Sequence, residues 1–198
     1  MLRYLREKNI KHKVIGNGSN LIFNSSGYNG VIIRLNNLDK LTINKNVITV
    51  EAGYSLMNLA LKVSKLGLTG MEFATGIPGT VGGAVYMNAG AYKSDMGYIV
   101  SEVTAITPNL EVITMYNNEL GFKYRTSFFQ RNPGYICISA TIVLRRGDKK
   151  IIKEIIEENA KLLVNENNDL YKGIVSKTTT ENSDICKFSY NELIKNNL

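Results

Sequence analysis

The strongest chemical signature in this chain is a group of glycines in one uncharged segment, residues 76–92. The segment reads Gly-Ile-Pro-Gly-Thr-Val-Gly-Gly-Ala-Val-Tyr-Met-Asn-Ala-Gly-Ala-Tyr, with five glycines and no charged side chain. Glycines this dense let the backbone adopt positive φ and let another surface approach the main chain closely. Free N–H groups in such a loop form a nest that favours anions, above all phosphates. The segment indicates either an anion-binding loop or a buried turn without a ligand.

A second loop of similar chemistry lies near the start of the chain. Val14 and Ile15 have the character of a strand end, and they run directly into Gly16-Asn-Gly-Ser-Asn-Leu21. The loop lacks the third glycine and the following amphipathic helix of the dinucleotide-binding fingerprint. Its small polar residues can still hold a phosphate through side chain and backbone. Two such loops in one small chain suggest a cofactor with a pyrophosphate at its centre.

A third stretch places an arginine among aromatic residues. Arg125 follows Tyr124 and precedes Phe128 and Phe129. Neighbouring rings can hold a guanidinium in place, and a fixed guanidinium can bind an anion or polarise a carbonyl through two N–H groups. We expect the rings to hold Arg125, with a binding role and a plain surface role both open.

Composition limits the classes of protein to consider. The 198 residues are 44% hydrophobic and 21% charged, which is typical of a globular chain with a real core. The net charge of +7 suits anionic partners, but the lysines are scattered and no basic strip interleaved with aromatics is present. A basic surface without nucleic-acid binding is therefore the favoured interpretation.

Cysteine and histidine chemistry is sparse. Cys137 and Cys186 follow no metal-binding or redox spacing, and Cys137 has the surroundings of a core residue. This usage predicts a reducing, cytoplasmic location. His12 is the single histidine and lies in a charged stretch, so we expect no catalytic triad, no metal site and no histidyl-linked cofactor. No signal peptide or membrane-spanning run is expected.

Hydrophobic periodicity predicts the elements that must position the three stretches. A helix is expected over 55–66, with Ser55 as N-cap and Gly67 just after its end, and another is expected to begin at Asp148. A short amphipathic helix is expected within residues 1–10. Strands are expected over 14–15, 31–35, 41–43, 47–50, 102–107, 111–115 and 135–144.

Taken together, the three stretches resemble one enzyme family. Gly16–Leu21, Gly76–Tyr92 and Tyr124-Arg-Thr-Ser-Phe128 agree in motif, order and spacing with UDP-N-acetylenolpyruvoylglucosamine reductase, also called UDP-N-acetylmuramate dehydrogenase. The linking pieces 68–74 and 120–124 are similar to the family as well. The likeness covers roughly residues 1–160.

The resemblance implies an α+β fold, the FAD-binding domain of the PCMH or vanillyl-alcohol-oxidase type with two subdomains. It divides the chain into a partial first subdomain (1–53), a second subdomain with the glycine segment (54–147), a helix (148–164) and a diverged or loosely ordered tail (165–198). It implies non-covalent FAD, NADPH as reductant, and reduction of UDP-GlcNAc-enolpyruvate to UDP-N-acetylmuramate. That product serves peptidoglycan synthesis, and so cell-wall biogenesis, cell shape and division.

The resemblance also gives individual residues roles. Arg125 would be catalytic, holding the substrate carboxylate and the charge that develops beside it. Tyr124 and Asn88 would bind the UDP-sugar substrate. The residues expected to bind FAD are Gly16, Asn17, Gly18, Ser19, Asn20, Leu21, Gly76, Ile77, Pro78, Gly79, Thr80, Val81, Gly82 and Gly83. No metal, nucleic acid or membrane is expected as a partner.

Some family features are missing from the sequence. The strand that opens the first subdomain is not recognisable, and neither is the Gly-Ser-Val-Phe-like stretch with its proton-donating serine. Ser176, Glu181 and Glu192 lack motif support, so none is assigned as an acid. Because general acid catalysis contributes ~10²–10⁴-fold to rate, slow turnover is expected. The alternatives are a non-catalytic remnant of the flavin domain, a related FAD oxidase on the same fold, and, on charge alone, a basic nucleic-acid-binding protein.

Overall fold

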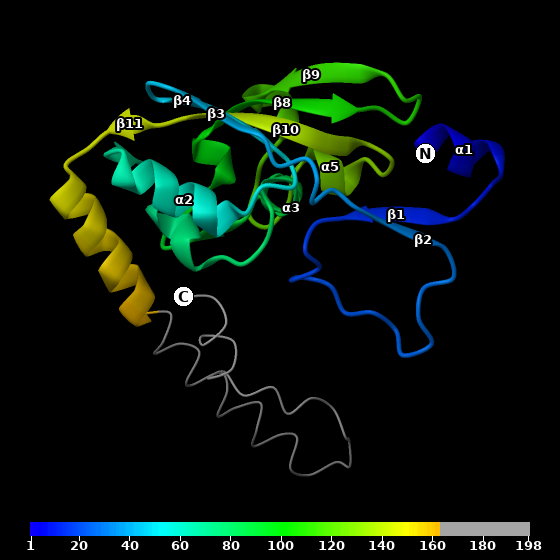
Figure 1. Ribbon diagram of the computed structural model, residues 1–198, viewed down its shortest axis with the longest axis horizontal. Helices are drawn as coiled ribbons and strands as arrows, with labels where there is room; N and C mark the ends of the chain where they lie inside the picture. The colour runs from blue at the N-terminus through cyan, green and yellow to red at the C-terminus, as the bar shows by residue number, and fades with distance from the viewer. Residues whose placement is uncertain (163–198) are drawn as a thin grey trace, which may run out of the picture. The chain divides into compact units, whose positions relative to one another are not determined.

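The strand expected over 135–144, which is rich in β-branched residues, is strand β10 (Ile136–Val143). It is the central strand of a five-stranded antiparallel sheet. In this computed structural model, which describes residues 1–162, the strand order is β3-β4-β10-β8-β9 (Figure 1). The other four strands are β3 (Leu41–Asn44), β4 (Val47–Glu51), β8 (Val100–Ile106) and β9 (Val112–Tyr116). The strands expected over 41–43, 47–50, 102–107 and 111–115 are confirmed; they form two hairpins, β3–β4 and β8–β9, and β10 joins them.

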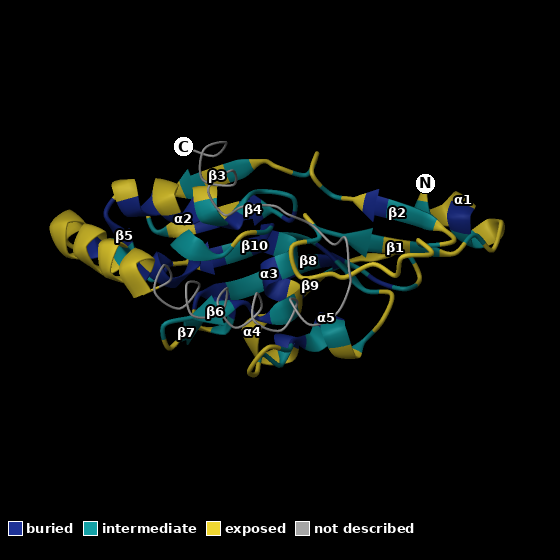
Figure 2. Cartoon of the chain, turned by 90° about the horizontal axis from the view of Figure 1, so that it is seen from below, coloured by how far each residue is buried: buried dark blue, intermediate teal, exposed yellow. Residues whose placement is uncertain are grey.

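One face of this sheet is covered by two helices, α2 (Leu56–Lys65) and α3 (Val81–Met87) (Figure 1). The main core lies between the helices and the sheet, where Ile48, Val103 and Ile142 have no exposed surface. Figure 2 shows buried positions gathered in the interior, with exposed positions on the outer helix turns. The structure thus has the α+β fold that the resemblance implies.

Helix α2 begins and ends as its sequence predicts. The Ser55 hydroxyl accepts a hydrogen bond from the Asn58 N–H at 3.3 Å, and Gly67, just after the helix, has φ +74°. Its buried residues are Leu56, Leu59, Ala60, Val63 and Ser64. Apolar positions with helical spacing therefore pack against the sheet, and the glycine takes the left-handed conformation that other residues avoid.

The first glycine loop belongs to a small parallel sheet. Helix α1 (Leu2–Glu7) leads into β1 (His12–Ile15), which pairs in register with β2 (Val31–Arg34). The long connection between these two strands carries residues 16–30 and is mostly exposed (Figure 2).

Short elements complete the described part of the chain. They are β5 (Leu68–Thr69), η1 (Glu72–Gly76), β6 (Gly90–Ala91), β7 (Ser94–Asp95), η2 (Met96–Tyr98), α4 (Asn117–Leu120), α5 (Phe128–Arg131) and β11 (Arg145–Arg146). A further helix occupies 149–162, and the Asp148 carboxylate accepts from the Lys150 N–H at 2.7 Å. The expected cap at Asp148 is confirmed.

Strand pairing crosses the expected boundary at residue 53. Strands β3 and β4 were assigned to the first subdomain (1–53), but β4 pairs with β10 along residues 47–51. The hairpin therefore belongs to the larger sheet. Its pairing partner lies 88 to 96 positions away, from Glu51–Ser139 to Val47–Val143, so residues near the hairpin do not indicate this pairing. The predicted tail, 165–198, lies outside the described residues.

Two adjacent glycines of α3 should respond oppositely to alanine. A β-carbon at Gly82 would lie 2.7 Å from the β-carbon of Ala52, whereas one at Gly83 would meet only the Thr80 hydroxyl, at 3.4 Å. We expect Gly82→Ala to lower the free energy of unfolding by ~1–3 kcal/mol through overpacking. Gly83→Ala should be neutral or stabilising, because alanine is favoured within a helix. Thermal or urea unfolding of both variants tests this, and equal stabilities would contradict the close packing at Gly82.

Candidate functional site

The two glycine loops, 59 positions apart in sequence, are joined in the structure. The Ser19 hydroxyl donates a hydrogen bond to the Pro78 carbonyl oxygen at 2.9 Å. A β-carbon at Gly16 would overlap the Thr80 hydroxyl, and one at Gly79 would touch the Ser19 hydroxyl at 3.4 Å. The glycines thus let the loops approach each other, and residues 16–19 and 78–80 form one surface.

The backbone of this surface has the conformations that glycine permits. Gly18 has φ +81° and Gly79 has φ +145°, both in regions that side chains with a β-carbon rarely adopt. Among the described residues, no hydrogen bond is donated by the N–H groups of residues 17–20. Neither loop contains a charged side chain. Unused N–H groups without a competing carboxylate are what an anion such as phosphate requires.

The second half of the glycine segment differs from the expected loop, because it forms helix α3. Val81 and Gly82 donate their N–H groups to the carbonyl oxygens of Tyr54 and Ala52, at 2.9 and 2.8 Å. Gly83 N–H is 3.3 Å from the Thr80 hydroxyl, which caps the helix. These three N–H groups are therefore occupied within the chain, whereas those of Gly79 and Thr80, like those of residues 17–20, donate no hydrogen bond among the described residues. The sequence analysis missed both the helix and the cap, although a threonine before Val-Gly-Gly-Ala-Val is a possible N-cap signal.

Arg125 stands near the other end of α3, at the tip of a tight turn. Lys123 and Thr126 exchange backbone hydrogen bonds of 3.0 and 3.1 Å, which leaves Tyr124 and Arg125 at the tip. Arg125 has φ +55°, an uncommon conformation for a residue with a side chain.

The turn holds Arg125 by its backbone and not by a cluster of rings, so the expected aromatic clamp is wrong. Phe129 is buried in the core and Phe128 packs edge-on against Tyr135. The Arg125 guanidinium has a ring contact only with Tyr124 among the described residues, at 5.8 Å, and Tyr124 is itself 88% exposed. The physical reason is that Phe128 and Phe129 begin helix α5 and turn inward to the core.

Asn88, expected to bind substrate, is buried in the structure. Its side-chain N–H donates to the Lys123 carbonyl oxygen at 3.0 Å, and its side-chain oxygen accepts from the Gly97 N–H at 2.9 Å. Each end of the amide therefore already has a partner within the chain. Ser127, quoted in the motif but given no role, is fully buried and donates to the Tyr86 carbonyl oxygen at 2.8 Å.

Other reactive groups within residues 1–162 do not form a competing site. Burial raises the pKa of Cys137 to about 12, so its thiol stays protonated and unreactive near neutral pH. Within residues 1–162 no group of three or more His, Cys, Asp or Glu side chains could hold a metal ion. No helix in that part of the chain is long and apolar enough to cross a membrane.

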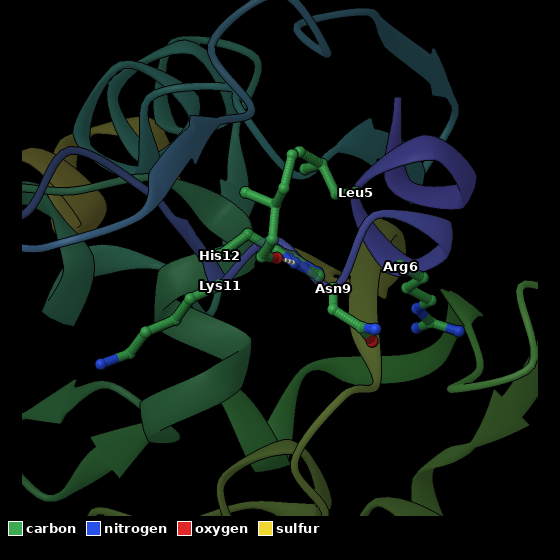
Figure 3. A pocket seen from close by; sticks show the side chains of 6 residues that line it. Leu5, Arg6, Asn9, Lys11 and His12 are labelled. Carbon is green, nitrogen blue, oxygen red and sulfur yellow. Dashed lines mark hydrogen bonds between the residues drawn. The ribbon is translucent and has the colours of Figure 1, made fainter.

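One surface hollow of about 470 Å³ lies away from both glycine loops, beside α1 and β1. Figure 3 shows its lining residues, with the charged ends of Arg6 and Lys11 pointing to opposite sides. His12 Nδ1 lies 3.0 Å from the Ile10 carbonyl oxygen. Since its cationic groups do not converge, this hollow is a poor anion site.

Comparison with known families identifies the class of protein. The family model described as "FAD binding domain" matches residues 1–116, more than half of the chain. The chain therefore belongs to the FAD-binding domain family, as the joined glycine loops and the α+β fold had indicated.

Individual relatives carry one name. UDP-N-acetylenolpyruvoylglucosamine reductase of Halalkalibacterium halodurans is 44% identical over 159 residues, covering 80% of this chain and 52% of the relative. The Bacillus subtilis protein of that name is 41% identical over 156 residues, covering 78% of this chain and 52% of the relative. The resemblance stated from the motifs is confirmed, and the chain spans about half the length of these curated relatives.

A solved structure agrees with the fold. The crystal structure of UDP-N-acetylenolpyruvylglucosamine reductase (MurB) from Thermus caldophilus superposes with a TM-score of 0.69 at 29% identity. The match covers 81% of this chain and 59% of that one.

Proposed function

We propose that this chain is the FAD-binding part of a flavin-dependent UDP-N-acetylenolpyruvoylglucosamine reductase. The observation that carries the proposal is the joined surface of residues 16–19 and 78–80, with its unused N–H groups. A pyrophosphate needs donors from the backbone and a close approach, and both glycine loops supply them. The relatives named above support the choice of reaction.

FAD fits the donors that the chain offers. We expect Gly16–Leu21 to face the pyrophosphate with backbone N–H groups, and Gly76–Gly83 to lie along the adjoining flavin. Helix α3 contributes to the shape of the site and not to its hydrogen-bond donors, because the N–H groups of its first turn are already bonded. When bound, FAD would supply hydride transfer between NADPH and the enolpyruvyl double bond.

The Arg125 turn suits the substrate side of the same proposal. Helix α3 has seven residues and is roughly 10 Å long at about 1.5 Å per residue, so the glycine loops and the turn stand at its two ends. An exposed guanidinium can bind the carboxylate of an enolpyruvyl group with two N–H groups. We propose that Arg125 binds this carboxylate and stabilises the negative charge that develops beside it. Tyr124 would line the same substrate site.

The proposed reaction also needs a proton donor. No serine or glutamate of the described residues is assigned that role, and Ser176, Glu181 and Glu192 lie outside them. Since the chain spans about half of its relatives, we expect FAD binding to be easier to detect than turnover. A cytoplasmic location is part of the proposal and rests on the cysteine usage.

The test is the visible absorption spectrum of the purified chain, recorded before and after FAD addition and desalting. The proposal predicts retained flavin bands that NADPH bleaches. Addition of UDP-GlcNAc-enolpyruvate should then reoxidise the flavin and restore its oxidised spectrum, at a full or a slow rate. A folded chain that retains no flavin would favour the non-catalytic remnant. Retained flavin that is reoxidised by oxygen but not by the enolpyruvyl substrate would favour the related oxidase.

A further inference from the structure

The exposed Arg125 turn is attached to the core at its base, and two buried side chains make the attachment. Asn88 and Ser127 are 3% and 0% exposed, and neither faces a described surface hollow. Arg125, in contrast, is exposed at the tip of the turn. The residues that hold the turn are therefore separate from the residues that it presents.

Asn88 joins three segments at the end of α3. It is the C-cap of the helix, with φ +45° and ψ +58°, a left-handed conformation that asparagine tolerates better than most residues. From this position its amide reaches the Lys123 carbonyl at the base of the turn and the Gly97 N–H of η2. One side chain thereby fixes the turn relative to the helix and to η2.

Ser127 makes the second attachment, on the other arm of the turn. Its hydroxyl donates to the Tyr86 carbonyl oxygen, near the end of α3. A third hydrogen bond is made near the turn by Arg131, whose guanidinium donates to the Gly121 carbonyl oxygen at 2.9 Å. Both arms, at Lys123 and at Ser127, are therefore tied to the last turn of the same helix.

We infer that Asn88 and Ser127 are positioning residues, which set where Arg125 stands relative to the glycine loops at the start of α3. The inference replaces the expected contact between Asn88 and substrate. It deepens the proposed function and rests on it, because the position of Arg125 matters only if Arg125 meets the substrate. A buried hydrogen-bonded amide in a left-handed cap is also difficult to substitute, since both the conformation and the two bonds must be kept.

The test uses the whole chain with FAD added and measures how freely the turn opens. An arginine-specific protease should cut after Arg125 only when the turn opens locally. Cleavage after the exposed Arg145 serves as the internal reference, and fragment masses distinguish the two sites. Asn88→Gly keeps the left-handed backbone and removes both hydrogen bonds, and it should raise the Arg125-to-Arg145 cleavage ratio about tenfold.

Three further variants sharpen the test. Ser127→Ala should raise the ratio in the same direction. Asn88→Asp keeps the acceptor for Gly97 but loses the donor for Lys123, so it too should open the turn. Asn159→Ala is the matched control: Asn159 is another buried asparagine, and its hydrogen bonds, donated to the Glu72 carbonyl oxygen and accepted from the Tyr92 hydroxyl, do not go to the turn. It should leave the ratio unchanged.

The outcomes separate this inference from the proposed function. A wild-type cleavage ratio in both Asn88→Gly and Ser127→Ala would overturn the positioning role. A raised Arg125-to-Arg145 cleavage ratio supports both the positioning role and the proposed function if two further results accompany it. The variant must retain flavin, and its kcat must fall by a larger factor than its KM changes. A raised ratio with unchanged turnover supports the attachment of the turn and counts against the role proposed for Arg125.

Discussion

Gly79→Val should abolish retention of FAD after desalting. Gly79 has φ +145°, where valine is strongly disfavoured, and a β-carbon there would touch the Ser19 hydroxyl at 3.4 Å. Forcing a β-branched residue into this conformation costs ~1–3 kcal/mol or moves the loop. Either effect separates the loop from Ser19, so we expect FAD affinity to fall by at least about tenfold. Flavin absorbance after desalting and a fluorescence titration with FAD measure the loss.

Gly134→Val is the matched control for that variant. Gly134 also has positive φ, +95°, and a β-carbon there would also meet a neighbour at 3.4 Å, in this case Pro108. It imposes similar backbone strain, and the atoms that its β-carbon would meet belong to Pro108 and not to either glycine loop. We expect it to lower stability while FAD retention stays normal. Equal loss of FAD in both variants would mean that general destabilisation, and not the loop geometry, removes the cofactor.

Arg125→Lys should lower kcat by ~10²–10³-fold while FAD retention stays unchanged, the size of effect seen when one preorganised donor to developing charge is lost. Lysine keeps the positive charge but offers a point charge in place of a planar fork, so it cannot bind a carboxylate with two parallel N–H groups. Steady-state reduction of UDP-GlcNAc-enolpyruvate with NADPH measures the effect. The perturbation of the flavin spectrum on substrate addition measures binding where turnover is slow.

Arg145→Lys is the control here. Arg145 is an exposed arginine of β11, and its strand pairs with β5 away from the turn. It should have wild-type turnover and flavin content. If Arg125→Lys also lost flavin, the turn would support the cofactor and the assignment to the substrate carboxylate would be wrong. If Arg125→Lys had full activity, Arg125 would have no part in the reaction.

Most of the regular elements were predictable from the sequence. Helix α2 is the clearest case, because Ser55, Gly67 and the apolar spacing between them each indicate the same element. The hairpins and β10 follow from β-branched alternation in the same way. Such signals are local: caps, turns and periodicity are set by residues within a few positions of one another.

Helix α3 was not predictable, although its residues formed the most distinctive segment. Gly82 and Gly83 disfavour a helix by intrinsic propensity. In the folded chain, Gly82 lets α3 approach Ala52, and the N–H groups of Val81 and Gly82 bond to the strand end and turn at residues 52–54. Tertiary contacts therefore outweigh local preference at this point.

The sequence by itself carried the resemblance to the family, and with it the α+β class, because motifs depend on residue types and on their spacing along the chain. Only the tertiary structure decided that Ser19 meets Pro78, that the hairpin over 41–51 joins β10, and that the Asn88 side chain bonds to Lys123. Each of these joins segments separated by 35 or more positions. Such pairings depend on how the whole chain excludes water and satisfies its buried polar groups, and that information is not local.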